Sequence, residues 1–328
     1  MNPGIDAGSV HIRVQGDGAK VIAAQVLSQR PQLARTLKGR QADDAAALVP
    51  LVFALCGRAQ GAAARLAVTA ARGQESSPRL APDIVREVMR EHLWRWLLDL
   101  PVLFGMLPLR DRFSTAVRAV DAGGGEAVQG LLAAPEIIRL IESIEALEQP
   151  PLGAAALLHI DSAQTSLADW PQLSEVLCRT PTWRGQAAET GAYARRTGDP
   201  APVSGAFAAR WLARLAELET WAAGAQNIGA GGTASAMPVA PGVGRALVET
   251  ARGLLMHEVV LEGDRVADYR IVAPTEWNFH PQGPLSGWLI GRPCSDEADL
   301  RGFAAQAVAA LDPCVRWDLT LESALQPH

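Results

Sequence analysis

The sequence has few aromatic residues and no excess of positive charge. Phe, Trp and Tyr make up 5% of its 328 residues, and the formal net charge is -5. A protein that binds nucleic acid needs a basic surface for the phosphates, often with aromatic rings on which bases stack. We therefore expect no nucleic-acid partner.

Long apolar segments are also absent. The longest apolar run, residues 45–57, is followed by Arg58 and is shorter than the roughly 20 residues that a membrane-spanning helix needs. The sequence begins M-N-P-G-I-D, which has neither the charged nor the apolar region of a secretion signal. These features predict a soluble, cytoplasmic protein with no membrane partner.

Cysteine is scarce, with four residues in the whole chain. Four cysteines would give a thin disulfide framework for a chain of this length, and the cytosol would keep them reduced. The thiols are therefore available as soft ligands, the kind that suits nickel, zinc or ferrous iron.

Apolar residues are present in sufficient number for a packed core. Hydrophobic residues make up 48% of the chain, close to the average for globular proteins. The length slightly exceeds the ~250–300 residues at which one core usually stops growing, without requiring two domains. We predict a single domain over residues 1–328.

Apolar patterning predicts strands near the N-terminus and helices through the middle of the chain. Residues 10–14 alternate apolar and polar side chains, and a Gly-Asp-Gly turn at 16–18 joins them to residues 21–26 as a hairpin. The predicted helical segments are residues 43–71 with breaks at Pro50 and Cys56-Gly57, residues 84–104 with a kink or end at Pro101, residues 112–147 with a break at 123–125, and residues 206–226.

The sequence pattern in the last third of the chain predicts a small sheet followed by one helix. Residues 227–236 are rich in Gly, Ala and Ser and predict a loop, but the glycines at 229–232 lack the flanking pattern of a phosphate loop. Ser295 is predicted to cap a helix over residues 296–311. The predicted strands are residues 243–250, 254–262 and 265–272, the last two joined by a Gly-Asp turn.

Two short motifs at opposite ends of the chain contain cysteine: L-C-G-R-A-Q around Cys56 and D-P-C-V-R-W around Cys314. Cys56 lies at a predicted break between helices, where the free N–H groups of the following helix favour a thiolate. From their surroundings, Cys178 and Cys294 are expected to be structural, and His257 to be packed in the core.

Together with R-G-L-L-M-H at 252–257 and V-A-P-T-E-W-N at 272–278, these motifs resemble the large subunit of nickel-iron hydrogenases. In that family R-x-C-G-x-C and D-P-C-x-x-C supply four thiolates, and an A-P-R-G strand and a P-(S/T)-T-W-N loop close over the iron. The resemblance places Arg252 and Thr275 as hydrogen-bond donors to the cyanide ligands of the iron, and it implies that residues 181–195 shape the pocket. It also implies an α+β fold that is mostly α, with a central helical bundle, a short N-terminal hairpin and a small sheet near the C-terminal third.

The second cysteine of each motif is missing, because Ala59 and Trp317 occupy those positions. A short hydrogenase-like chain of this kind resembles the hydrogenase-maturation scaffold proteins of the HupK/HoxV type. The resemblance implies a protein that is not an enzyme: Cys56 and Cys314 hold an iron fragment, Fe(CN)2CO, as transient cargo, and no nickel is bound. Its implied partners are the hydrogenase large-subunit precursor and a small HypC-type chaperone.

Two other functions stay open from the sequence. A metalloenzyme with a shifted ligand set would recruit Cys294 or His257 to complete the coordination of its metal. A metal-free chaperone would only imitate the surface of the large subunit. Thr320 occupies the place where hydrogenases end in a histidine beside a processed tail, so no processing site is expected.

Overall fold

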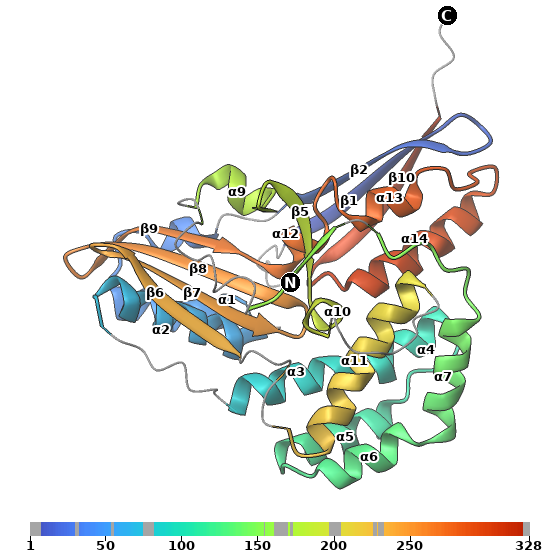
Figure 1. Cartoon of the computed structure of the whole chain (residues 1–328), viewed down its shortest axis with the longest axis horizontal. Helices are drawn as coiled ribbons and strands as arrows, with labels where there is room; N and C mark the ends of the chain where they lie inside the picture. The colour runs from blue at the N-terminus through green and yellow to red at the C-terminus, as the bar shows by residue number, and fades with distance from the viewer. Residues whose placement is uncertain are drawn as a thin grey trace, which may run out of the picture.

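The computed structural model describes residues 8–29, 33–53, 56–74, 82–153, 155–160, 170, 173–196, 205–225, 228 and 233–323. Figure 1 shows a four-stranded sheet, a group of helices beside it, and a second sheet formed by strands from the two ends of the chain. About half of the described residues are helical and a quarter are in strands, which confirms the predicted fold class.

The four-stranded sheet is antiparallel, with the order β6-β7-β8-β9. Its central strands are buried on both faces, because α1 and α2 cover one face and an apolar cluster around Trp183 and Trp277 covers the other. The first three residues of β6 were wrongly predicted as loop and the others were not predicted as strand, since Pro238 and small residues give this edge strand a weak pattern. Residues 229–232 of that loop lie outside the described residues. The strands are β6 (Ala234–Ala240), β7 (Val243–Thr250), β8 (Gly253–Glu262) and β9 (Arg265–Val272).

Helices α1 (Ala42–Val52) and α2 (Gly57–Ala71) pack against this sheet through alanine and glycine. The approach is closest at Gly244 of β7, where an added Cβ would lie 2.1 Å from the carbonyl oxygen of Ala67. The predicted break at Pro50 is wrong. Proline lies in the last turn of α1, where the loss of one hydrogen bond is tolerated, and its ring packs against α2.

The helical group beside the sheet is built around two large rings. Trp96 and Trp211 meet edge to face with ring centroids 5.8 Å apart, both fully buried. The segment predicted as one helix, residues 84–104, instead contains a π-helical turn, and the segment 112–147 has a second break before Pro135. The elements are α3 (Pro82–Trp94), the π turn η3 (Arg95–Asp99), α4 (Leu100–Leu103), α5 (Arg110–Asp121), α6 (Gly125–Leu132), α7 (Pro135–Glu145) and α11 (Ala206–Ala222).

A three-stranded sheet joins the two ends of the described chain. The predicted hairpin is confirmed as β1 (Ser9–Gly16) and β2 (Val21–Gln29), while β10 (Arg316–Ser323), which was not predicted, pairs in parallel with β1. Helix α14 (Glu297–Leu311) packs beneath it, and its N-cap is Asp296 rather than the predicted Ser295. The Asp296 carboxylate accepts hydrogen bonds from two amides of the first turn, at 2.8 and 3.2 Å.

Short elements complete the described part of the chain. A third sheet has the order β3-β5-β4 and lies against the four-stranded sheet. None of the helices in the described ranges is both long and apolar enough to cross a membrane. The remaining elements are η1 (Leu33–Leu37), β3 (Ala156–Leu158), α9 (Glu175–Arg179), β4 (Thr182–Trp183), β5 (Gln186–Thr190), α10 (Ala192–Arg195), α12 (Pro274–Asn278) and α13 (Pro284–Leu289).

The contact between α2 and β7 predicts that Gly244→Ala strongly destabilises the protein. The added methyl group would clash with the backbone of α2, and overpacking of this kind costs about 1–3 kcal/mol or more. Gly130→Ala is the matched control, because Gly130 lies in α6 with nothing within 4 Å of an added Cβ. Urea unfolding of both variants measures the effect; equal midpoints for the two would contradict the packing described here.

Candidate functional site

The two motif cysteines come from opposite ends of the chain and approach the same arginine. Cys56 immediately precedes α2, and Cys314 follows the C-terminal end of α14. The charges of Cys314 and Arg252 both act on the pKa of the Cys56 thiol, which places the three groups close together. The fold therefore unites residues that are far apart in the sequence.

The Cys56 thiol does not have the lowered pKa that its position before a helix predicts. Burial raises its pKa to about 12, and the neighbouring Cys314 adds to the rise. The carboxylate of Glu87 accepts hydrogen bonds from the backbone N–H groups of Arg58 (2.7 Å) and Ala59 (3.0 Å). These amides open α2, so Glu87 takes up the donors that would have stabilised a thiolate.

Thr275 lies directly against Cys314. Its hydroxyl oxygen is 3.2 Å from the Cys314 sulfur and accepts a hydrogen bond of 3.3 Å from the Cys314 backbone N–H. Thr275 is buried in the first turn of α12, whereas Cys314 is half-buried. The hydroxyl thus keeps one hydrogen that can be donated to the sulfur or to a group bound beside it.

Arg252 is held by two carboxylates. Its Nη2 lies 2.7 Å from Glu91 of α3, and its Nε lies 3.4 Å from Asp312. Burial opposes the charge, but Asp312 and Glu91 outweigh it and raise the pKa of Arg252. In the part of the chain that the structure describes, its Nη1 has no partner. One nitrogen of a fixed guanidinium is therefore available beside the thiols.

Asp312 links the cysteine motif to the helical group. It is the C-cap of α14 in the left-handed region, with φ 56°, and it lies two residues before Cys314. Its Oδ1 is 2.7 Å from Nη2 of Arg95, which the π turn η3 carries. Burial opposes its charge, but Arg95 and Arg252 lower the pKa of Asp312 to about 2. The carboxylate is therefore ionised and fixes the start of the Cys314 segment.

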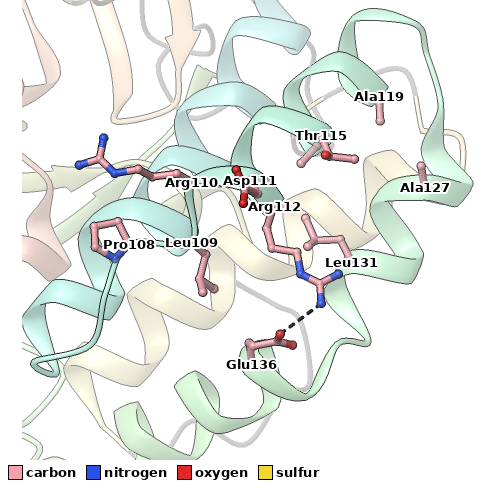
Figure 2. Close-up of a pocket in the computed structure, with 11 residues that line it drawn as sticks. Pro108, Leu109, Arg110, Asp111, Arg112, Thr115, Ala119, Ala127, Leu131 and Glu136 are labelled. Atoms are coloured by element: carbon pink, nitrogen blue, oxygen red, sulfur yellow. Dashed lines mark hydrogen bonds and ion pairs between the residues drawn. The ribbon is translucent and has the colours of Figure 1, made fainter.

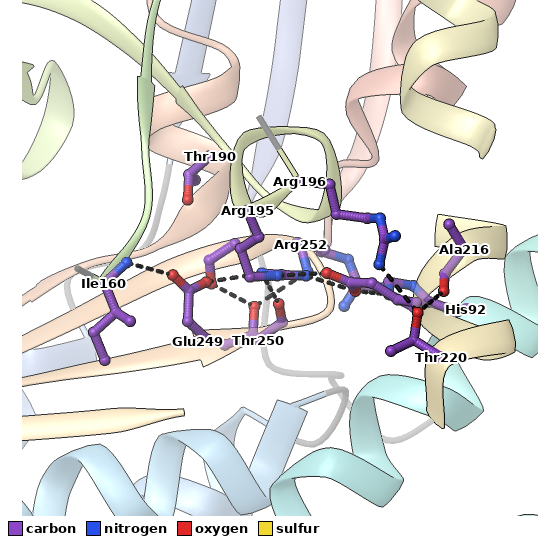
Figure 3. A network of polar contacts seen from close by, with 12 residues as sticks. His92, Ile160, Thr190, Arg195, Arg196, Ala216, Thr220, Glu249, Thr250 and Arg252 are labelled. Atoms are coloured by element: carbon purple, nitrogen blue, oxygen red, sulfur yellow. Dashed lines mark hydrogen bonds and ion pairs between the residues drawn. The ribbon is translucent and has the colours of Figure 1, made fainter. Parts of the chain in front are cut away.

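A second buried network lies next to Arg252 (Figure 3). Arg195 pairs with Glu217 at 2.7 Å and with Glu249 at 2.8 Å, and His92 lies 2.7 Å from Glu217. The Glu249 side chain also accepts the N–H of Ile160 at 2.8 Å. These contacts join α3, α10, α11 and β7, so the walls around Arg252 are fixed by paired charges.

The segment 181–195 contacts the Arg252 turn, as expected for a segment that shapes the pocket. Gly191 has φ 121°, and an added Cβ would lie 3.1 Å from the Arg252 carbonyl oxygen. The neighbouring Thr190 accepts the N–H of Leu254 at 2.8 Å and gives its own N–H to Asn278 at 2.9 Å. Glycine is required here by both backbone conformation and space.

The two positions that lack cysteine are taken up by packing. Ala59 is fully buried in an apolar cluster with Ile84 and Val248. Trp317 belongs to β10, pairs with Val10 and packs against the core under the N-terminal sheet. Neither residue can donate a ligand, so the site has the thiol of one cysteine from each motif.

Three further candidate ligands, His257, Cys294 and Cys178, have other contacts in the fold. His257 is fully buried, with Nε2 2.9 Å from the Gln60 side chain and Nδ1 2.7 Å from the Tyr269 hydroxyl, so both ring nitrogens have protein partners. Cys294 is buried in the core under the N-terminal sheet. Cys178 of α9 is partly buried, and burial raises its pKa to about 11. None of the three completes the donor set around Arg252.

The donor set of the site is therefore small. It consists of two thiols, the Thr275 hydroxyl and one guanidinium nitrogen of Arg252. Among the described residues no group of three or more His, Cys, Asp and Glu side chains is arranged to hold a metal ion. This arrangement fits a metal fragment that brings most of its own ligands, and it does not fit a bare ion that needs four protein donors.

Sequence reasoning did not single out the carboxylates that organise the site. Glu87 and Glu91 are four residues apart in α3 and reach the start of α2 and Arg252 respectively. This spacing places both on one helix face and was the available signal. The role of Arg95 had no such signal, because it depends on the π turn.

Comparison with known proteins places the chain in a family. The family model described as nickel-dependent hydrogenase matches residues 203–316. The hydrogenase expression/formation protein HupK of Rhizobium leguminosarum bv. viciae is 32% identical over 98% of this chain and 98% of its own length. The hydrogenase expression/formation protein HoxV of Cupriavidus necator is 31% identical over 92% of this chain and 93% of its own length.

Solved structures show the same fold. The nickel-iron-selenium hydrogenase of Desulfovibrio vulgaris Hildenborough matches with a TM-score of 0.60 at 15% identity, covering 90% of this chain and 94% of that chain. An NAD+-reducing nickel-iron hydrogenase matches with a TM-score of 0.53 at 16% identity, over 91% and 93% of the two chains. With relatives above 30% identity over nearly its whole length, the chain belongs to the HupK/HoxV family of hydrogenase expression/formation proteins.

Proposed function

We propose that this protein is a non-catalytic scaffold in the maturation of nickel-iron hydrogenases. It receives the Fe(CN)2CO fragment, holds it briefly and passes it to the large-subunit precursor. The observation that carries the proposal is the meeting of Cys56 and Cys314 beside a free nitrogen of Arg252, with neither motif's second thiol present. The names of its relatives, hydrogenase expression/formation proteins, support the same process.

The chemistry of the donors suits this cargo. Low-spin ferrous iron with cyanide and carbon monoxide needs few protein ligands, and soft thiolates are suitable ones. Cyanide nitrogens accept hydrogen bonds, which Arg252 Nη1 and the Thr275 hydroxyl can donate. Cys56 must lose a proton on binding, and its raised pKa weakens the grip at neutral pH. A weak grip favours release to a site that offers four thiolates.

The partners follow from the direction of transfer. In this proposal a small HypC-type chaperone delivers the fragment, and the large-subunit precursor receives it, in the cytoplasm. The alternative of a metalloenzyme with a shifted ligand set is disfavoured because both ring nitrogens of His257 have protein partners and Cys294 is packed in the core under the N-terminal sheet. A metal-free chaperone would share the fold but would carry no iron. Iron analysis and infrared spectra of protein purified anaerobically from hydrogenase-producing cells separate these functions.

The incomplete donor set predicts that the protein neither takes up nor evolves hydrogen. Metal catalysis needs a complete coordination set, and Ala59 and Trp317 cannot provide it. Dye-linked hydrogen uptake should stay at the level of the buffer, with mature hydrogenase from the same cells as the positive control. Equimolar nickel together with hydrogen uptake would contradict the proposed role.

Cys56→Ala and Cys314→Ala are each expected to abolish retention of the iron fragment and to leave the fold intact. Each removes one of two thiols at half-buried positions. Cys178→Ala is the matched control, since that cysteine lies on α9 and should be dispensable. The readouts are cyanide and carbonyl infrared bands per protein and circular dichroism. Bands of normal intensity in both site variants would show that these thiols are not the ligands.

Arg252→Leu is expected to weaken retention by about one to two powers of ten, because a hydrogen bond with a charged donor contributes roughly 1.5–3 kcal/mol. The cyanide bands should shift more than the carbonyl band, since cyanide is the stronger acceptor. Arg252→Lys should restore part of the effect. Arg245→Leu removes a fully buried arginine of β7 that pairs with Glu258 and controls for lost buried charge. Identical cyanide bands in Arg252→Leu and Arg245→Leu would show that Arg252 is only structural.

A further inference from the structure

An apolar knob projects from the helical group, far along the sequence from either cysteine motif. Residues 100–109 contain no charged residue, and they form α4 and the turn that leads to α5. Val102, Met106 and Leu107 are exposed in this segment, Leu107 by 85%. Three exposed large apolar side chains within six residues are typical of a surface that binds another protein, and methionine is common on such surfaces.

A groove is lined by residues that follow this knob in the sequence, and Figure 2 shows these lining residues. It has a volume of about 570 Å³ and starts at Pro108, the residue after Leu107. Its apolar lining comes from Leu109, Leu131 and alanines of α5 and α6, and at one side Arg112 of α5 pairs with Glu136 of α7 at 3.1 Å. An apolar lining with a charged rim is the usual arrangement of a protein interface, and the volume accommodates a few side chains.

Two adjacent residues of opposite charge lie on the rim. Arg110 and Asp111 open α5, line the groove and are both exposed. Neither side chain has a hydrogen bond or an ion pair to any other part of the described chain. The other two charged residues of the lining, Arg112 and Glu136, pair with each other, so Arg110 and Asp111 are the lining charges that can meet a partner.

We propose that this face binds a second copy of the same chain in a two-fold dimer. In a two-fold interface the same patch faces itself, so in this proposal the knob of each copy fills the groove that follows it in the sequence of the other. The Leu107 side chain of each copy enters the groove of the other. Arg110 of each copy pairs with Asp111 of the other, giving two identical ion pairs. The free charges of opposite sign favour this occupant, because a patch that carries both signs is its own electrostatic complement.

The small size of such a contact indicates the kind of association to expect. A knob of three side chains and a groove of this size form an interface near the lower end of the range for specific complexes, which corresponds to transient association. The dimer should therefore form reversibly at high protein concentration. It involves neither cysteine motif, so it does not depend on the proposed cargo function.

Sedimentation velocity over a micromolar to near-millimolar series tests the proposal on the purified full chain. Wild type should shift from monomer to dimer, and Leu107→Asp should weaken association by about tenfold or more, because it buries a carboxylate at the centre of the contact. Val176→Asp is the matched control, since Val176 is 73% exposed on α9, outside this face. It should dimerise as wild type does.

Charge reversal tests the reciprocal pairing itself. Arg110→Asp places two carboxylates opposite each other at both symmetric positions, and Asp111→Arg does the same with two guanidinium groups, so each should weaken the dimer. The double variant Arg110→Asp/Asp111→Arg restores opposite charges and should recover association. A wild type that stays monomeric at every concentration overturns the proposal. So does a double variant as weak as the singles, or a Leu107→Asp variant that dimerises as wild type does.

Discussion

The carboxylate of Asp312 is the contact on which the site depends. It lies within ion-pair distance of Arg95 and Arg252. Asp312 is the C-cap residue of α14 and lies two residues before Cys314. Through these two arginines the end of α14 is tied to the π turn after α3 and to the turn between β7 and β8. Three separate parts of the chain thereby fix one cysteine.

Burying charged side chains at this junction costs free energy. An ion pair inside a protein loses most of its hydration, and well-packed apolar residues often give equal or greater stability. What the pairs contribute is a defined geometry, since Arg195, Glu217 and Glu249 have little freedom once paired. The depressed pKa of Asp312 also makes its contribution to stability pH-dependent. That contribution is complete above its ordinary pKa of 3.8 and is lost as the pH falls towards 2.

The periodicity of apolar residues and the turn residues were sufficient to predict several elements of the fold. The hairpin of β1 and β2, the strands β7 to β9 and the long helices α11 and α14 follow from periodicity and turn residues. Strand β10 was missed because it pairs with β1 across the whole length of the chain, and no local pattern encodes such a partner. The π turn at residues 95–99 was missed because its residues continue the helical pattern of α3 and carry no local signal for a change of helix type.

The candidate site shows the same division. Motif resemblance led to Cys56, Cys314, Arg252 and Thr275, and the structure brings all four together. The pKa of Cys56 was expected to be lowered by the start of the following helix, but it is raised. The expectation took no account of Glu87 of α3, whose carboxylate accepts hydrogen bonds from the first backbone N–H groups of α2.

The absence of a second cysteine in each motif and the raised pKa of Cys56 act in the same direction in the proposed function. A metal site with four thiolates, rigid walls and low pKa values would hold its metal permanently. Here the walls are rigid, as the buried ion pairs around Arg252 require, while the ligands are few and Cys56 resists ionisation. In the proposed function, the rigid walls serve to recognise the shape of the iron fragment and its hydrogen-bond acceptors, and the weak ligand set serves to release it. Recognition and release then depend on different groups of atoms, as the transfer of a cargo requires.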